Sequence, residues 1–237
     1  MQKNLNQLLF GDKAILVTEK IADHRQSLYP EERALISGVI EKRAHEFSTG
    51  RFCARQALLE FGIDNFPVLR GEQREPIWPK NIVGSISHCK DIAGAVVACT
   101  DNIKSVGFDI ENRKQVNPDI ARHICTKEEK CWLDVQNLTQ QNLALLVIFS
   151  IKEAIYKCVY QTTGQSLRFR QCQIIPSLDD GIAEIMVDPY EASLQMGEIC
   201  LRFHITDTHV YSYAIWQLLT IDSTPLVFTE PISEFKD

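Results

Sequence analysis

"SVGFDIENRK", residues 105–114, combines the alternation of a half-buried strand with two acidic residues. Its apolar residues recur at every second position, and a period of two indicates a β-strand. Asp109 and Glu111 therefore share the opposite face of that strand. Two carboxylates this close repel each other unless a cation or a proton intervenes, so the stretch predicts a partner opposite them. For an Asp-x-Glu pair alone, a solvent-facing strand without function is the alternative.

Helix patterns followed by strand patterns occur twice along the chain. Residues 28–62 predict two helices, the second starting from a cap at 48–50, and residues 84–111 predict three strands. After a helix capped by Thr126 and Glu129 comes a long helix over 140–160, and then alternating strands. We therefore expect an α+β fold of two similar halves, residues 1–106 and 107–237, with antiparallel sheets packed on helices.

The predicted long helix carries a charged pair in "FSIKEAIYK", residues 149–157. Glu153 and Lys157 are four residues apart and share one helix face. Such pairs are common on exposed helices, but this helix follows the apolar run "LALLVIF". Together with the strand acids, Glu153 completes a set of three carboxylates. Hard oxygen ligands of this kind suit Mg²⁺, which keeps several waters and substrate phosphate oxygens in its shell.

Two further features concern Ser87, His88 and a group of arginines. "VGSISHCKDIAGAVVA", residues 83–98, presents Ser87 and His88 together near a turn. A turn histidine without function is one alternative, and a Ser–His hydrolase is another, although no G-x-S-x-G elbow is present. Guanidinium groups can bind phosphate with two parallel hydrogen bonds. The arginines available for this lie on the second helix and the loop after it, at Arg43, Arg51, Arg55, Arg70 and Arg74.

Composition narrows the class of protein. The chain of 237 residues has a formal net charge of −6, which argues against a nucleic-acid partner. Its eight cysteines form no Cys-x-x-Cys pair, so the spacing does not predict a zinc site. The N-terminal sequence lacks the apolar segment of a signal peptide, and no apolar run is long enough to span a bilayer. We therefore expect a cytoplasmic protein without a membrane span.

Five segments, taken together, resemble the 4′-phosphopantetheinyl transferase superfamily. The resemblance is strongest to the monomeric, enterobactin-synthetase component D-like group, which serves siderophore and other nonribosomal peptide synthetases. The specific signature is Asp-x-Glu followed about forty residues later by Lys-Glu-Ala-x-x-Lys. The segments are "EKRAHEFSTGRFCARQAL" (41–58), "GEQREPIWP" (71–79), "GSISHCKDIAGAVVA" (84–98), "VGFDIE" (106–111) and "FSIKEAIYK" (149–157). One departure is Phe149, where many members carry Trp.

The resemblance implies a fold of two pseudo-symmetric halves with coenzyme A in the cleft between them. Asp109, Glu111 and Glu153 would bind Mg²⁺, while Glu153, Glu111 and Lys157 would serve the chemistry. Ser87 and His88 would contact the adenosine phosphate end of the coenzyme. The remaining coenzyme-binding residues that the resemblance implies are Arg43, Arg51, Arg70, Arg74, Lys152 and Lys157.

The implied reaction transfers the phosphopantetheine arm of coenzyme A to a serine of an apo acyl, aryl or peptidyl carrier domain. It releases adenosine 3′,5′-bisphosphate, and the enzyme would act as a monomer. Three alternatives stay open at this point: a non-catalytic coenzyme A or carrier-binding module, another Mg²⁺-dependent phosphotransferase or nuclease, and the Ser–His hydrolase.

Overall fold

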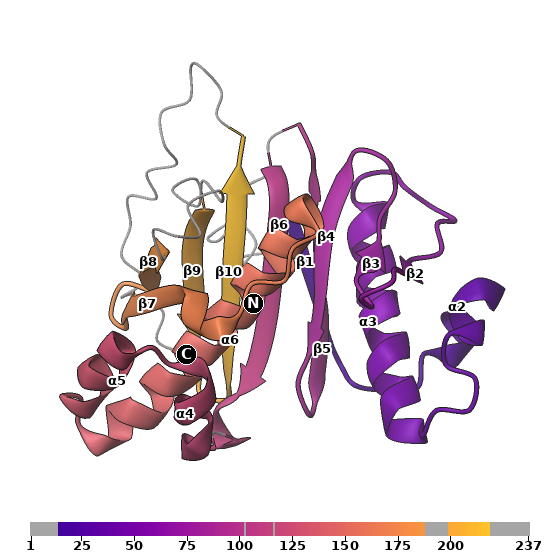
Figure 1. The fold of residues 1–237 in the computed structure, drawn as a ribbon. Coiled ribbons are helices and arrows are strands. Elements are labelled where there is room, and N and C mark those ends of the chain that lie inside the picture. The colour runs from indigo at the N-terminus through magenta and orange to yellow at the C-terminus, as the bar shows by residue number, and fades with distance from the viewer. Residues whose placement is uncertain (1–13, 102, 116, 188–198, 219–237) are drawn as a thin grey trace.

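The structure is a computed structural model that describes residues 14–101, 103–115, 117–187 and 199–218 (Figure 1). Its helices are α2 (Pro30–Ala34), α3 (Glu41–Leu59), α4 (Ala121–Ile124), α5 (Lys127–Asp134) and α6 (Leu138–Thr163). Its strands are β1 (Ala14–Lys20), β2 (Leu69–Arg70), β3 (Pro76–Ile77), β4 (Ile82–His88), β5 (Ile92–Cys99), β6 (Ile103–Asn112), β7 (Cys172–Ser177), β8 (Ile182–Val187), β9 (Ile199–Ile205) and β10 (His209–Gln217). The predicted α+β class is confirmed.

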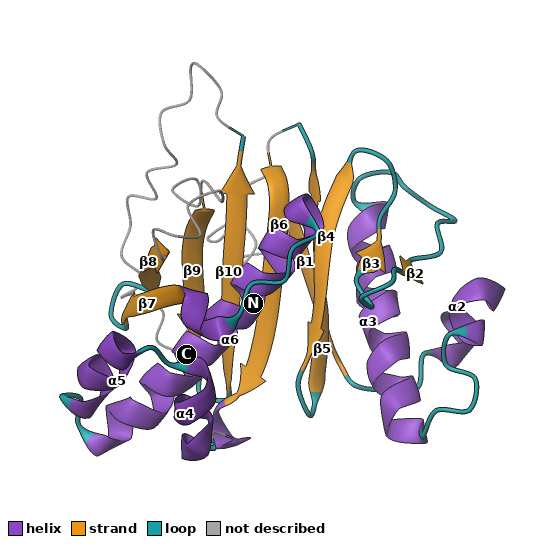
Figure 2. Cartoon of the chain, viewed as in Figure 1, coloured by secondary structure: helices purple, strands orange, loops and turns teal. Residues whose placement is uncertain are grey.

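Two antiparallel sheets pack face to face between two helices. One sheet has the order β1-β5-β4 and the other the order β6-β10-β9-β8-β7, while β2 and β3 form a separate short ribbon. Apolar side chains of β1 and β5 meet those of β6 and β10 in one core, with Phe108 stacked on Tyr213. The outer face of the first sheet packs on α3, and that of the second packs on α6 (Figure 2).

Helix α3 differs from the prediction. We expected a helix boundary at residues 48–50, but α3 runs without interruption from Glu41 to Leu59. Ser48 and Thr49 accept hydrogen bonds from the backbone amides of His24 and Ala22, at 3.2 and 3.1 Å. The two hydroxyls thus serve a distant segment instead of capping a helix. The predicted preceding helix is also shorter, because α2 ends at Ala34.

Helix α6 lies unusually close to β6 at Gly107. A Cβ atom at Gly107 would lie 1.7 Å from the carbonyl oxygen of Ala154, so no side chain fits between the helix and the strand. This close approach lets α6 cross directly over β6 (Figure 1), on the face of the strand to which Gly107 belongs. It depends on a residue without a Cβ atom.

The predicted boundary between residues 106 and 107 falls inside β6. β6 belongs to the second sheet, while its apolar face contributes to the core shared with the first. The division into residues 1–106 and 107–237 stays a prediction. None of the described helices, α6 included, combines the length and apolar character that crossing a membrane requires.

Candidate active site

The candidate site lies where the edge strands of the two sheets meet. β4 ends one sheet and β6 ends the other. The hydroxyl of Ser85 on β4 accepts a hydrogen bond from the backbone amide of Phe108 on β6, at 3.1 Å. Two residues farther along β4, the Ser87 hydroxyl donates to Oδ1 of Asp109, the residue after Phe108 on β6, at 2.8 Å. Ser85 and Ser87 share one face of β4, because alternate side chains of a strand point the same way, and that face contacts first the backbone of β6 and then the Asp109 side chain.

Asp109 is a buried carboxylate whose two oxygens are both occupied. Only 3% of the residue is exposed. Oδ1 accepts hydrogen bonds from Ser87 and from the Lys157 ammonium, each at 2.8 Å, and Oδ2 accepts one from the Ser150 hydroxyl at 2.9 Å. Lys157 also donates to the carbonyl oxygen of Phe108, at 3.0 Å. A buried charge needs such partners, and here they come from β4 and α6.

Glu111 and Glu153 lie half-buried beside Asp109 and Lys157, and their negative charges are poorly compensated by positive ones. Burial raises the pKa of Glu111 to about 8, the negative charges of Asp109 and Glu153 add to the shift, and Lys157 opposes it. Burial also raises the pKa of Glu153, with Lys157 opposing and Asp109 adding. The three acids therefore act on one another electrostatically, and a single lysine does not balance them. Such a site favours an added cation.

The carboxylates of Asp109, Glu111 and Glu153 have the chemistry of a divalent-cation site, although their oxygen atoms do not form a compact cluster. Among the described residues, only Cys89, Asp91 and His209 bring three ligand atoms within 4.8 Å of one another. Asp109 is held by its three donors, and the negative charges of Asp109 and Glu153 repel that of Glu111, which opposes closer approach. Three carboxylates on a strand and a facing helix nevertheless supply the hard oxygens that Mg²⁺ prefers.

A basic region borders the acids on the side of α3. Arg43 on α3 donates a hydrogen bond to Nε2 of His88, at 2.8 Å. Because arginine has no acceptor, Nε2 accepts and the ring proton lies on Nδ1. Burial lowers the pKa of His88, while Glu46 opposes the shift and Arg43 and Lys157 reinforce it. Histidine in this setting is neutral at physiological pH.

Arg70 and Arg74 extend this basic region. Burial lowers the pKa of Arg70, and the positive charges of Arg43 and Arg74 add to the shift, so the three guanidinium groups share one surface. The Arg70 guanidinium also lies 5.5 Å from the centre of the Phe47 ring. Three clustered guanidinium groups beside a neutral histidine form a site suited to phosphate.

Comparison with known proteins identifies the family of this chain. A family model described as the 4′-phosphopantetheinyl transferase N-terminal domain matches residues 31–98, and one described as the 4′-phosphopantetheinyl transferase superfamily matches residues 105–212. The 4′-phosphopantetheinyl transferase Npt of Nocardia iowensis is 34% identical over 157 residues, which cover 66% of this chain and 69% of the relative. The chain belongs to the 4′-phosphopantetheinyl transferase superfamily.

Other members of the superfamily match over shorter parts of their length. The 4′-phosphopantetheinyl transferase Svp of Streptomyces mobaraensis is 34% identical over 65% of this chain and 63% of the relative. Enterobactin synthase component D of Escherichia coli K12 is 38% identical over 49% of this chain and 54% of the relative. The matched region thus spans less than two thirds of either protein. Holo-[acyl-carrier-protein] synthase of Neisseria meningitidis superposes with a TM-score of 0.39 and 20% identity, over 48% of this chain and 97% of that one.

Of the two lysines in the superfamily signature, the structure brings only Lys157 to the site. Lys152 is 2% exposed, and its ammonium donates to the Glu129 carboxylate at 2.7 Å and to the carbonyl oxygens of Ile124 and Phe169 at 2.9 and 2.8 Å. All three donors of the ammonium are used, by acceptors on α4, on α5 and in the segment before β7. The expectation that Lys152 binds the coenzyme therefore has to be corrected.

Arg51 also differs from the expectation of direct phosphate contact. It is 5% exposed, its Nε donates to the carbonyl oxygen of Val68 at 2.6 Å, and its guanidinium lies 4.4 Å from the centre of the Phe47 ring. A second nitrogen donates to the carbonyl oxygen of Leu69 at 3.4 Å. Burial lowers the pKa of Arg51 to about 10. Arg51 therefore holds the start of β2, which carries Arg70, and is not itself a surface phosphate ligand.

Ser87 and His88 do not form a hydrolase pair. Ser87 bonds to Asp109 and Lys157, whereas His88 bonds to Arg43. Neighbours in a strand point to opposite faces, which explains the separation. Ser87 thus positions Asp109 and Lys157, and His88 lies on the basic side.

Sequence reasoning missed Ser150 and Glu46. Ser150 precedes Glu153 by three residues and Lys157 by seven, a spacing that shares one helix face and could have identified it. Glu46 is 8% exposed, accepts from Arg43 at 3.2 Å and lies 3.9 Å from Nε2 of His88. Its spacing of three residues from Arg43 is the corresponding signal.

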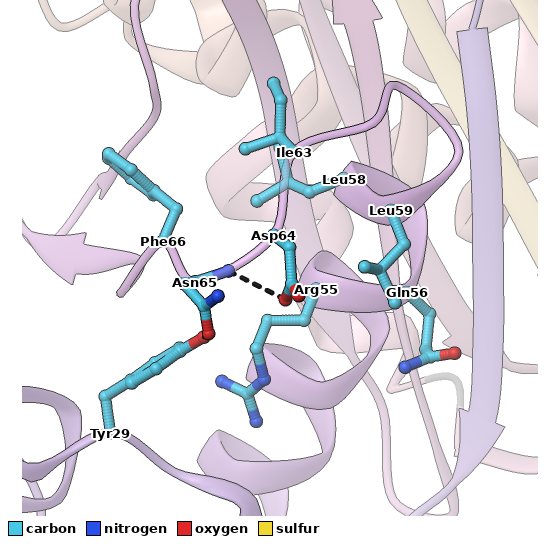
Figure 3. Close-up of a pocket in the computed structure, with 9 residues that line it drawn as sticks. All are labelled: Tyr29, Arg55, Gln56, Leu58, Leu59, Ile63, Asp64, Asn65 and Phe66. Atoms are coloured by element: carbon cyan, nitrogen blue, oxygen red, sulfur yellow. Dashed lines mark hydrogen bonds between the residues drawn. The ribbon is translucent and has the colours of Figure 1, made fainter.

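A small hollow elsewhere on the molecule is not lined by a comparable group of functional side chains. It measures about 250 Å³ and lies against the last turns of α3, with Tyr29, Arg55 and Phe66 in its wall (Figure 3). Of the arginines that the sequence offers for phosphate binding, Arg55 alone lines it. Its one arginine is already paired with the buried Glu32, at 2.7 Å. The charge of Arg55 is therefore already balanced by a buried partner.

The raised pKa of Glu111 predicts a pH-dependent cost in stability. Because the folded state disfavours the charged carboxylate, the protein is more stable when Glu111 is protonated. This stabilisation is complete below the ordinary pKa of glutamate and is lost as the pH rises toward 8. Without divalent metal, Glu111→Gln should therefore raise Tm at pH 8.5 by roughly 2–6 °C, equivalent to about 1–2 kcal/mol, and by less at pH 6. Calorimetry in EDTA at both pH values measures this, and an equal difference at both would contradict it.

Proposed function

We propose that this protein transfers the 4′-phosphopantetheine arm of coenzyme A to a serine hydroxyl of an apo carrier protein. The serine oxygen forms a bond to the β-phosphorus of the coenzyme, the bond from that phosphorus to the bridging oxygen breaks, and adenosine 3′,5′-bisphosphate leaves. The observation that carries the proposal is the meeting of Asp109, Glu111, Glu153 and Lys157 beside a cluster of arginines. Membership of the superfamily supports the same reaction.

Asp109, Glu111 and Glu153 are the residues that would hold Mg²⁺. A divalent cation there would withdraw negative charge from the diphosphate as the leaving group departs. The Lys157 ammonium, fixed between Ser87 and Asp109, adds positive charge at the same place. The basic region of Arg43, Arg70, Arg74 and His88 would bind the adenosine phosphates, with arginine matching phosphate in forked geometry.

The proton of the attacking serine must pass to a base. Asp109 already accepts three hydrogen bonds, so it is a poor acceptor for a further proton. Glu153 and Glu111 have raised pKa values and lie beside it. A raised pKa makes both carboxylates better proton acceptors when they are ionised. We assign the role to Glu153, which lies on α6 at the edge of the acidic site, directly or through water, with Glu111 as the alternative.

Incubation with coenzyme A, Mg²⁺ and a set of apo carrier domains tests the proposal. Intact-mass measurement should find one phosphopantetheine added to at least one carrier, with loss of the product when its acceptor serine is replaced by alanine. Absence of the adduct on every carrier, with coenzyme A still bound, would favour the non-catalytic binding module instead.

Carrier domains of siderophore or other nonribosomal peptide assembly are the partners to test first. Enterobactin synthase component D proteins are among the relatives, which supports this choice. Such carriers are intracellular, so we propose that the protein acts in the cytoplasm. We also propose that it acts as a monomer and without a nucleic-acid partner.

His88→Ala should weaken coenzyme binding more than chemistry. His88 lies with Arg43 and Glu46 on the basic side, and the described contacts include none between its ring and Asp109, Glu111 or Glu153. We expect KM for coenzyme A to rise by about tenfold, equivalent to about 1.4 kcal/mol of binding, with kcat within about threefold. Steady-state kinetics at varied coenzyme A measures both. A collapsed kcat with unchanged KM would contradict this role.

A further inference from the structure

Three potential metal ligands of different chemistry meet outside the candidate active site. Cys89 and Asp91 lie in the turn between β4 and β5, and His209 begins β10. Their sulfur, carboxylate oxygen and ring nitrogen lie within 4.8 Å of one another. We propose that these three side chains form a second metal site, of the borderline-soft class that binds Zn²⁺.

The spacing of the ligand atoms fits tetrahedral zinc. Zn²⁺ binds sulfur at about 2.3 Å and nitrogen or oxygen at about 2.0–2.2 Å, so tetrahedral neighbours lie roughly 3.3–3.6 Å apart. Nε2 of His209 is 3.1 Å from Oδ1 of Asp91, and Sγ of Cys89 is 3.4 Å from the same oxygen. Two of the three separations are therefore close to those of a bound ion.

Neighbouring groups hold the ligands in place. Without metal, the 3.1 Å contact to a carboxylate oxygen places the ring proton of His209 on Nε2, which donates to Asp91. Metal binding would displace that proton. The Thr208 hydroxyl, 2.8 Å from Nδ1, can accept a hydrogen bond from the Nδ1–H tautomer, in which the Nε2 lone pair faces the metal. The Asn112 side chain donates to Asp91 at 3.1 Å. Hydrogen bonds of this kind fix the tautomer and orientation of metal ligands.

Burial makes the site enclosed on one side and open on the other. Cys89 is 9% exposed and His209 4% exposed, whereas the Asp91 side chain is 52% exposed. Three protein ligands with one solvent-facing side leave a position for water. This is the arrangement of a three-ligand zinc site, and not that of a closed four-ligand structural site.

The site joins the two sheets. Cys89 and Asp91 connect strands of the first sheet, while His209 and Asn112 belong to the second. An ion bound here would link the two sheets and stabilise their association, because it binds the folded chain better than the unfolded one. This inference does not depend on the proposed transferase activity. The acids of the candidate active site contain no sulfur, which separates the two sites experimentally.

Cobalt and zinc binding to the chelator-treated full chain test the inference. Co²⁺ should give a thiolate-to-metal charge-transfer band in the near ultraviolet, and Zn²⁺ should abolish it with a stoichiometry of one. At Zn²⁺ concentrations about 100-fold above Kd, Tm should rise by roughly 5–10 °C. Cys89→Ser should remove the band and lower zinc affinity by roughly 100-fold, and His209→Ala should lower the affinity similarly.

The matched control is Cys131→Ser, since Cys131 is an exposed cysteine on α5. It should keep the band, and so should Glu153→Gln, which alters only the acidic site. Cys89→Ser changes little volume, so its folded state can be verified by circular dichroism before titration. A band that persists in Cys89→Ser, or zinc affinity equal in all variants, would overturn the inference.

Discussion

Lys152→Met should destabilise the protein by about 3–5 kcal/mol without a direct effect on coenzyme binding. The Lys152 ammonium is buried and pairs with Glu129 at 2.7 Å, where Glu129 is itself 0% exposed. Removing the lysine leaves a buried carboxylate without its countercharge. Breaking one partner of such a pair is far more damaging than replacing both.

The Glu129 carboxylate has structural partners beyond Lys152. It accepts hydrogen bonds from the amides of Thr126 and Ile174, at 2.7 and 2.6 Å. It thereby links the start of α5 to β7, and Lys152 joins both to α6. Loss of the lysine should loosen these three elements together, because buried polar networks fail as a unit.

Urea unfolding of four proteins measures this effect. Lys127→Met is the matched control, since Lys127 is exposed on the same helix as Glu129, and it should change stability by less than about 0.5 kcal/mol. Lys152→Met/Glu129→Gln should recover part of the loss, because glutamine keeps an acceptor and carries no charge. A fully stable Lys152→Met that binds coenzyme A poorly would return Lys152 to the coenzyme site.

The contrast between Lys152 and Lys157 shows how much of the site could be predicted from sequence. Both lysines belong to the superfamily signature, so resemblance alone assigns them one role. Five residues apart at 100° per residue, they point about 140° from each other on the helix. Lys157 shares the face of Glu153 and Ser150, while Lys152 faces the interior. Helical spacing would have separated the two, and the buried partner Glu129, far away in sequence, could not have been found.

The fold was predictable where the signal was local. Alternation identified β4, β5 and β6, and the capping box at Thr126 is present as expected. The predicted boundary at residues 48–50 was wrong because Ser48 and Thr49 bond to backbone more than twenty residues away. A serine or threonine that caps a helix and one that ties a helix to a distant loop look alike in sequence.

Alternation also placed Asp109 and Glu111 on one face, but it could not supply their partners. That Ser87 binds Asp109 depends on the meeting of two sheet edges, a tertiary contact. The same limit applies to Cys89, Asp91 and His209, since the histidine lies 118 residues after the aspartate. Sites formed by distant segments become visible only when the topology is known.

Glu153→Gln should lower kcat/KM for transfer by roughly 10²–10⁴-fold while the fold stays intact. The substitution keeps the shape of the side chain and removes the charge that both metal binding and proton acceptance require. Because the pKa of Glu153 is already raised by burial, loss of its charge should not reduce stability. Intact-mass assays with the most active carrier measure the rate, and calorimetry measures the stability.

Glu128→Gln, on the exposed face of α5, is the matched control and should retain full activity. Comparison with Glu111→Gln then divides the two roles. If Glu153 accepts the proton, the residual rate of Glu153→Gln should lose the acid limb of the pH profile, while that of Glu111→Gln keeps it and requires more Mg²⁺. Near-normal turnover in Glu153→Gln would exclude both metal binding and proton acceptance as roles of Glu153. The acids of β6 would then have no partner acid on α6.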